Sequence, residues 1–98
     1  MDTRANLVRG GDRRQCHGLQ VRYAARNRLC AEVRYHGAVR LVEPYSLRIP
    51  GTGNLLLYVF ELRRNGAPTM GIKAYKVAEI QAAQVTGQAF SPRFAIEL

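Results

Sequence analysis

The sequence predicts a mainly β protein, a small barrel of five or six strands preceded by one short helix. Short segments of alternating or wholly apolar residues recur from residue 29 onwards, at the spacing of about 8–12 residues that small all-β domains show. Turn-forming residues separate these segments. The clearest is the Asn65-Gly66 pair, because both central residues of a type I′ hairpin turn need positive φ. A chain of 98 residues can build one modest core and is too short for two.

The chain divides into a flexible basic tail over residues 1–18 and a folded domain over residues 19–98. The tail is interrupted by glycines, shows no apolar periodicity and carries Arg4, Arg9, Arg13 and Arg14. We interpret it as a solvated start of the chain, and the alternative is a segment that becomes ordered on a partner. No apolar stretch follows these arginines, so we expect no secretory signal and a cytoplasmic location.

A short helix is predicted to open the domain. Leu19, Tyr23 and the Ala24-Ala25 pair would give two helical turns an apolar side, and arginines would lie on the other side. Asn27 can end this helix, because asparagine tolerates the left-handed conformation that follows many helices.

Residues 29–42 are predicted to form a first hairpin. Apolar and polar residues alternate in its first half, as in a half-buried strand, and the predicted inward residues are Leu29, Ala31, Val33 and Tyr35. The turn is His36-Gly37. Pro44 cannot donate a hydrogen bond to a sheet, so we expect the returning strand to bend or stop there.

Further strand segments follow the proline. Residues 45–49 alternate again, and residues 50–53 are a turn by composition. Residues 55–62 are apolar on both faces, as in a central strand that is covered on both sides. Residues 78–85 and 90–96 are predicted to complete the barrel with one or two short strands.

Residues 70–75 are predicted to pair with the central strand across the Asn65-Gly66 turn. In this strand we expect Ile72 and Ala74 to face inward, with Lys73 and Tyr75 facing outward.

The charge balance is the most informative part of the composition. Lys and Arg number 15 against 7 Asp and Glu, which gives a formal net charge of +8. Such an excess favours polyanionic partners through counterion release and steering. The alternative is that the charge only keeps a small protein soluble. No apolar run approaches the roughly 18 residues of a membrane helix, so we expect no contact with a membrane.

Three segments, in this order and spacing, resemble the bacterial WYL domain family. Segments before and after them fit the opening and the end of the family pattern, so the resemblance covers residues 19–98. The three segments are 42–48 (VEPYSLR), 54–61 (NLLLYVFE) and 73–80 (KAYKVAEI), and the flanking ones are 31–37 (AEVRYHG) and 90–94 (FSPRF). The resemblance implies an Sm-like small β-barrel that senses a ligand, often in transcription regulators. The implied ligand is single-stranded DNA, another nucleic acid or a nucleotide-type molecule.

The chain departs from the family at two positions. Leu56 stands where the family has a tyrosine, and Glu79 stands where it has an arginine that the resemblance would make a ligand contact. A glutamate repels the phosphate that an arginine would hold. The chain is therefore expected to bind with other residues or to bind something else.

The sequence favours a non-catalytic protein. Its only serines are Ser46 and Ser91, both aspartates lie in the tail, and the glutamates are scattered singly, so neither a Ser-His-Asp arrangement nor paired carboxylates can be argued. Cys16 and Cys30 are expected to be reduced thiols. With the two histidines they lack the short paired spacings of a zinc site, so we expect neither a metal nor another cofactor.

Candidate contacts for a nucleic acid are the cations on predicted outward or boundary positions, together with one aromatic side chain. A sheet that binds single strands needs cations along a groove and π faces for the bases. Tyr45 and Tyr58 are predicted to lie in the core, whereas Tyr75 is an even choice between core and stacking face. The predicted binding residues are Arg34, Arg40, Arg48, Lys73, Tyr75 and Lys76.

Two functional hypotheses remain open from the sequence. The first is a ligand-sensing or nucleic-acid-binding domain for single-stranded DNA, RNA or a nucleotide-like ligand. The second is a protein-interaction module, either an accessory subunit for a larger partner or a homodimer formed through strand edges.

Overall fold

The computed structural model describes residues 13–51 and 53–98, so the first twelve residues of the predicted tail lie outside the described part. The elements in chain order are α2 (Arg13–Arg26), β1 (Leu29–Tyr35), β2 (Ala38–Arg48), β3 (Leu56–Arg64), β4 (Ala67–Lys76), the 3₁₀ helix η1 (Val77–Glu79) and β5 (Ile80–Ala89). Among the described residues, no helix has the length and apolar character needed to cross a membrane.

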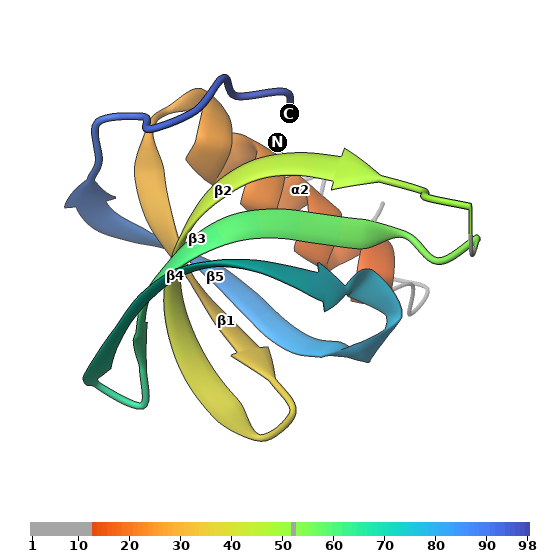
Figure 1. The fold of residues 1–98 in the computed structure, drawn as a ribbon, viewed down its shortest axis with the longest axis horizontal. Coiled ribbons are helices and arrows are strands. Elements are labelled where there is room, and N and C mark those ends of the chain that lie inside the picture. Colours follow the sequence, from red (N-terminus) through yellow and green to blue (C-terminus); the bar gives the residue numbers. More distant parts are fainter. Residues whose placement is uncertain (1–12, 52) are drawn as a thin grey trace, which may run out of the picture.

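The strands form one curved antiparallel sheet in the order β4-β3-β2-β1-β5 (Figure 1). The predicted mainly β class is confirmed, with one α-helix before the sheet in the described part of the chain. The predicted closure into a barrel is wrong, because the sheet is open with β4 and β5 at its two edges. The physical reason lies in the connection: after β4 the chain passes through η1 and pairs β5 with β1 instead of with β4.

Helix α2 packs on β1, β2 and β5 through a narrow face. The fully buried residues of this face follow the helical period and are Val21, Ala24 and Ala25. The helix begins at Arg13, so it includes residues that were predicted to belong to the tail. The predicted apolar side is wrong at Leu19 and Tyr23, which are 44% and 58% exposed. The two alanines let the helix lie close to the sheet, and the larger side chains face outward.

One face of the sheet and α2 enclose the core. Its buried residues come from α2, from every strand and from η1: Val21, Ala24, Ala31, Val33, Tyr35, Val42, Leu57, Val59, Tyr75, Val77 and Ile80. The inward residues predicted for the first strand are confirmed at Ala31, Val33 and Tyr35. The predicted turns are also present. Asn65 and Gly66 have φ of 51° and 83°, as a type I′ turn requires.

Two irregularities change the predicted strands. β2 does not stop at Pro44 but continues to Arg48, and its register with β3 shifts between Pro44 and Ser46, so that the predicted bend is a bulge within one strand. The left-handed residue after α2 is Arg28, with φ of 52°, rather than Asn27.

A bulge in β4 reverses the faces predicted for that strand. Arg63 pairs with Pro68 and Glu61 pairs with Gly71, so β4 has one extra residue between these two pairs. A shift of one residue moves every following side chain to the opposite face. Tyr75 is therefore buried, at 1% exposed, whereas Ile72 is 64% exposed. The predicted outward position of Tyr75 and inward position of Ile72 are both wrong for this reason.

Residues 90–98, which we call the C-terminal segment, do not form the strand predicted there. The segment runs past the ends of β1 and β2 (dark blue in Figure 1). Backbone hydrogen bonds hold it: the Phe90 N–H donates to the Arg28 carbonyl over 2.9 Å, and the Glu97 N–H donates to the Tyr45 carbonyl over 2.8 Å.

Candidate functional site

Both faces of β3 are apolar, but only one is fully covered. Leu57, Val59 and Glu61 lie on the inner face, which packs on the core, and all three are buried. Alternate residues lie on the outer face and are half-buried: Leu56, Tyr58, Phe60 and Leu62. The prediction of a strand covered on both sides is therefore only half right, and the outer face presents apolar and aromatic surface to solvent.

A groove of about 380 Å³ lies on this outer face, between the strands and the C-terminal segment. We call it the outer groove, and its lining residues are Tyr45, Ser46, Arg48, Tyr58, Val59, Ile72, Phe94, Ala95 and Glu97. In register, Tyr58 stands between Ser46 and Ala74, two small side chains. Ile72 and Phe94 are 64% and 47% exposed. The outer groove therefore places accessible aromatic surface beside the guanidinium of Arg48.

A buried carboxylate holds the C-terminal segment against this face. Glu43 is 3% exposed, and its Oε1 accepts hydrogen bonds from the Tyr45 hydroxyl over 2.7 Å and from Arg93 Nε over 3.1 Å. The Arg93 guanidinium also lies over the Phe60 ring, 4.0 Å from its centroid. Burial and the hydrogen bond to Glu43 raise the pKa of Tyr45 to about 12, against an opposing contribution from the backbone of Arg93. Tyr45 is a core residue, as predicted.

A second buried carboxylate, Glu61, occupies the inner face. It accepts hydrogen bonds from the Tyr75 hydroxyl and from Arg40 Nη1, the latter over 3.2 Å. Burial alone would raise the pKa of Glu61, but hydrogen bonds from Tyr75, Thr69 and Arg40 outweigh it and hold the pKa below its usual range. The Tyr75 ring stacks on the Tyr35 ring with centroids 4.5 Å apart. Burial and the bond to Glu61 raise the pKa of Tyr75.

The structure separates the six residues predicted to bind nucleic acid. Arg40 and Tyr75 both belong to the internal Glu61 cluster: Arg40 lies at a part-buried boundary position, whereas Tyr75 is 1% exposed, so its predicted outward position is wrong. Arg48 lines the outer groove and pairs with Glu97 over 2.5 Å. Arg34 and Lys73 are exposed on β1 and β4.

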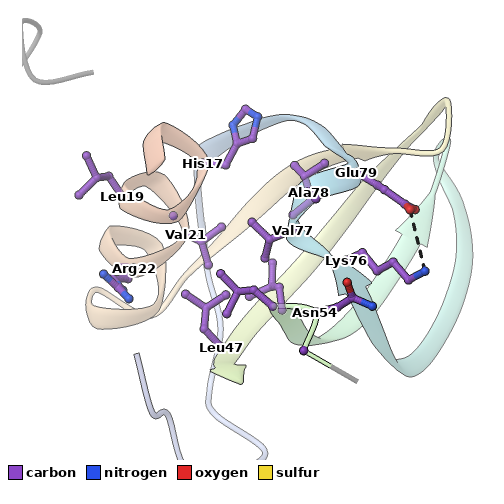
Figure 2. Close-up of a pocket in the computed structure, with 15 residues that line it drawn as sticks. His17, Leu19, Val21, Arg22, Leu47, Asn54, Lys76, Val77, Ala78 and Glu79 are labelled. Carbon is purple, nitrogen blue, oxygen red and sulfur yellow. Dashed lines mark ion pairs between the residues drawn. The ribbon is translucent and has the colours of Figure 1, made fainter. Parts of the chain in front are cut away.

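Lys76 lies away from the outer groove, at the rim of a larger cavity. This cavity has a volume of about 600 Å³ and lies between α2, η1 and the ends of β2 and β3; we call it the α2 cavity (Figure 2). The Lys76 ammonium is 4.0 Å from Glu79 Oε2 there. Lys76 therefore lines the α2 cavity and Arg48 lines the outer groove, although both residues pair with Leu56 in the strand register.

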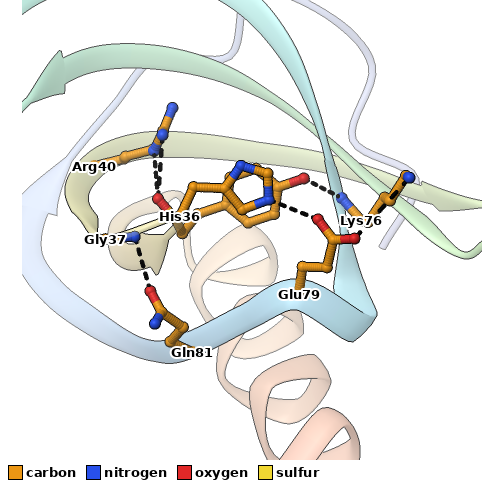
Figure 3. Close-up of polar contacts among 7 residues, drawn as sticks. His36, Gly37, Arg40, Lys76, Glu79 and Gln81 are labelled. Atoms are coloured by element: carbon orange, nitrogen blue, oxygen red, sulfur yellow. Dashed lines mark hydrogen bonds and ion pairs between the residues drawn. The ribbon is translucent and has the colours of Figure 1, made fainter.

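Polar contacts tie the β1–β2 turn to η1 and β5 beside the α2 cavity (Figure 3). His36 Nε2 is 2.6 Å from Glu79 Oε1, and the Gly37 N–H donates to Gln81 Oε1 over 3.0 Å. The hydrogen bond with His36 lowers the pKa of Glu79. Glu79, where the predicted resemblance would place an arginine, is thus engaged within the chain. Leu56, where the resemblance would place a tyrosine, lies on the outer face.

Cys30 is buried, and burial together with the charge of Glu43 raises the pKa of its thiol to about 11, which disfavours the reactive thiolate. Among the described residues, no group of three or more His, Cys, Asp or Glu side chains is placed to hold a metal ion.

Comparisons with known proteins give no relative: no family model, no curated protein and no solved structure matches this chain. The resemblance to the WYL family therefore stays a prediction. Sequence reasoning missed Tyr58, Phe94 and Arg93 as parts of a surface site. The alternation in β3 does group Tyr58 with Phe60, but both faces of that strand are apolar, so the pattern cannot show which face is open.

Proposed function

We propose that this protein is a non-catalytic domain that binds single-stranded nucleic acid in the outer groove. The observation that carries the proposal is the groove itself, in which Tyr58 and Phe94 offer aromatic surface beside Arg48. Bases of any sequence stack on aromatic side chains, and cations along the same groove follow the phosphates. The net charge of +8 supports a polyanionic partner for the chain as a whole.

The predicted cations differ in their positions relative to the outer groove, so each would have a different role in binding. Arg48 would contact a phosphate directly, since its present partner Glu97 is an exposed carboxylate that a phosphate can replace. Lys73 is exposed on edge strand β4, but its register partner is Val59 on the inner face, so its predicted outward position is reversed with that of Tyr75 and it would not contact a strand in the outer groove. Arg34 stands on β1, on the same sheet face as Glu43 by strand register, and would lie further along the strand of nucleic acid.

The proposal includes an Sm-like architecture of the WYL type with a role in ligand sensing. The support for this architecture is the order of elements, a helix followed by five antiparallel strands. In addition, Leu56, where the resemblance would place a tyrosine, lies on the same face of β3 as Tyr58. In this proposal Tyr58 takes over the stacking role that Leu56 cannot perform.

The test is fluorescence anisotropy with a short fluorescein-labelled oligothymidylate and an RNA of equal length. Tyr58→Ala should lower the affinity about tenfold, since one stacked base is lost. Its control is Tyr23→Ala, which removes an exposed tyrosine from α2. Equal affinities for the two variants would overturn the site.

The salt dependence of binding separates a defined site from general charge attraction. Arg48→Gln should reduce the slope of log affinity against log salt by about 0.7, the value for one phosphate contact on a single strand. Arg22→Gln changes the net charge equally but lies on α2. If both variants lose the same slope, the binding is non-specific and the proposal is wrong.

A protein-interaction module is the second candidate, and one observation favours it. β4 is an edge strand, and on it Met70 and Ile72 are 54% and 64% exposed. An edge strand with apolar neighbours can accept a strand from another chain. Sedimentation velocity distinguishes the two candidates: association that Ile72→Lys abolishes, without oligonucleotide binding, would favour this second function.

A further inference from the structure

The α2 cavity has a floor of buried apolar side chains. Its volume of about 600 Å³ lies within the range of about 300–1,000 Å³ that small-molecule sites occupy. In Figure 2 the apolar side chains of α2, β2 and η1 meet at its centre, and the polar ones stand around them. The floor is formed by residues that are 0–7% exposed, together with the half-buried Leu47: Val21, Leu57, Val77 and Ile80.

The rim of the cavity favours a negative charge. Its cations are Arg22 and Lys76, and its acid is Glu79. The Glu79 carboxylate is already engaged by His36 at 2.6 Å and by Lys76 at 4.0 Å. Arg22 pairs with no acidic side chain among the described residues, so its charge is available at the mouth. Asn54 adds an amide at the same rim.

We propose that the α2 cavity binds a small amphipathic organic anion, with its apolar body on the floor and its anionic group at the Arg22 side of the rim. The floor supplies the affinity by removing apolar ligand surface from water. The rim selects the charge, because an uncharged molecule of the same shape gains nothing from the Arg22 guanidinium. This site is independent of the outer groove, which lies on the opposite face of β3.

The first test uses 8-anilinonaphthalene-1-sulfonate, an aromatic anion whose fluorescence rises in apolar surroundings. We expect saturable binding by the folded full chain. Ala78 is exposed on η1 at the cavity, so Ala78→Phe fills the mouth without disturbing the core and should lower the affinity at least tenfold. The matched control, Ala74→Phe, places the same ring on β4 outside the cavity and should bind as the unmodified protein does.

The charge requirement has its own test. Arg22→Gln should weaken the binding of the sulfonate about fivefold, whereas Arg64→Gln, at the tip of the β3–β4 hairpin, should not. Decanoate should displace the dye at concentrations where decan-1-ol does not. Equal displacement by the two would overturn the anionic part of the proposal.

Identical titrations of the Ala78→Phe and Ala74→Phe variants would overturn the site, as would loss of binding in the latter alone. Should Ala78→Phe fail to fold, amide NMR of the unmodified protein decides: dye-induced shifts must include Val21 and residues 77–80. Oligonucleotide binding takes no part in these experiments, so their outcome is separate from that of the proposed function.

Discussion

Two buried glutamates, one on each face of the sheet, have the same kinds of partner in different surroundings. Glu61 on the inner face has Arg40 and Tyr75, and Glu43 on the outer face has Arg93 and Tyr45. The partners of Glu61 stand on β2 and β4, so its cluster joins three strands. The arginine of Glu43 comes instead from the C-terminal segment, which contains no strand.

The difference lies in how completely each charge is removed from water. The Arg40 side chain is 11% exposed and that of Arg93 is 41% exposed. A buried pair that loses one member leaves an uncompensated charge, whereas a half-exposed arginine can turn to solvent. The inner cluster therefore joins three strands of the sheet, and the outer cluster joins the C-terminal segment to β2 through an arginine that is more exposed to water.

Removal of the inner carboxylate should have the largest effect. Glu61→Ala leaves Arg40 and the Tyr75 hydroxyl buried without their acceptor and should lower the free energy of unfolding by about 3–5 kcal/mol. Urea unfolding followed by circular dichroism measures it. A loss below about 1 kcal/mol would mean that the inner cluster is solvated, contrary to its burial.

Removal of the outer carboxylate should cost less and act locally. Glu43→Ala should lower the free energy of unfolding by about 1–2 kcal/mol, because Arg93 can be rehydrated. Amide hydrogen exchange should accelerate in residues 91–98 and remain slow in β2 and β3. If exchange accelerated equally throughout the sheet, the two clusters would not differ as we describe.

The hairpin and the first strand could be predicted from the sequence, and the outer groove could not. Asn65-Gly66 encodes its turn locally, through the positive φ that both residues accept. The bulge opposite Glu61 and Arg63 has no such local signal, since the residue with positive φ in it is Met70, at 48°, and methionine does not favour that conformation. That single extra residue reversed the predicted faces of β4.

The same limit applies to the predicted site. Charge and alternation identified Arg48 and Lys73 as exposed cations, but Arg40 alternates in the same way and is paired inside. Which cation finds a buried acid depends on contacts between distant strands, and the position of Phe94 depends on a segment without periodicity. The local sequence pattern therefore predicts neither the pairing of Arg40 with Glu61 nor the position of Phe94.

Acid should weaken the inner cluster. The pKa of Glu61 is lowered in the folded state, so its contribution to stability is present above the unfolded value of about 4.5 and is lost as the pH falls through the lower folded value. Urea midpoints measured from pH 7 to pH 3 should therefore decline below about pH 4.5. The decline should be shallower in Glu61→Gln, and identical profiles would contradict the assignment.

The smallest effect concerns the exposed pair at the edge of the outer groove. Glu97→Gln frees Arg48 from its carboxylate and should raise the affinity for a single-stranded oligonucleotide about two- to threefold, as expected for an exposed ion pair worth less than 1 kcal/mol. Anisotropy at low salt measures it, with Glu32→Gln on β1 as the control of equal charge. Equal gains in both variants would show a general charge effect instead of release of Arg48.

The most direct test of the central claim is an amide NMR titration of the full chain with short single-stranded DNA at low and at moderate salt. We expect shifts around Tyr58, Arg48 and Ile72 and in the C-terminal segment that persist at moderate salt. Shifts that are confined to the arginines outside the outer groove and vanish with salt would contradict the claim.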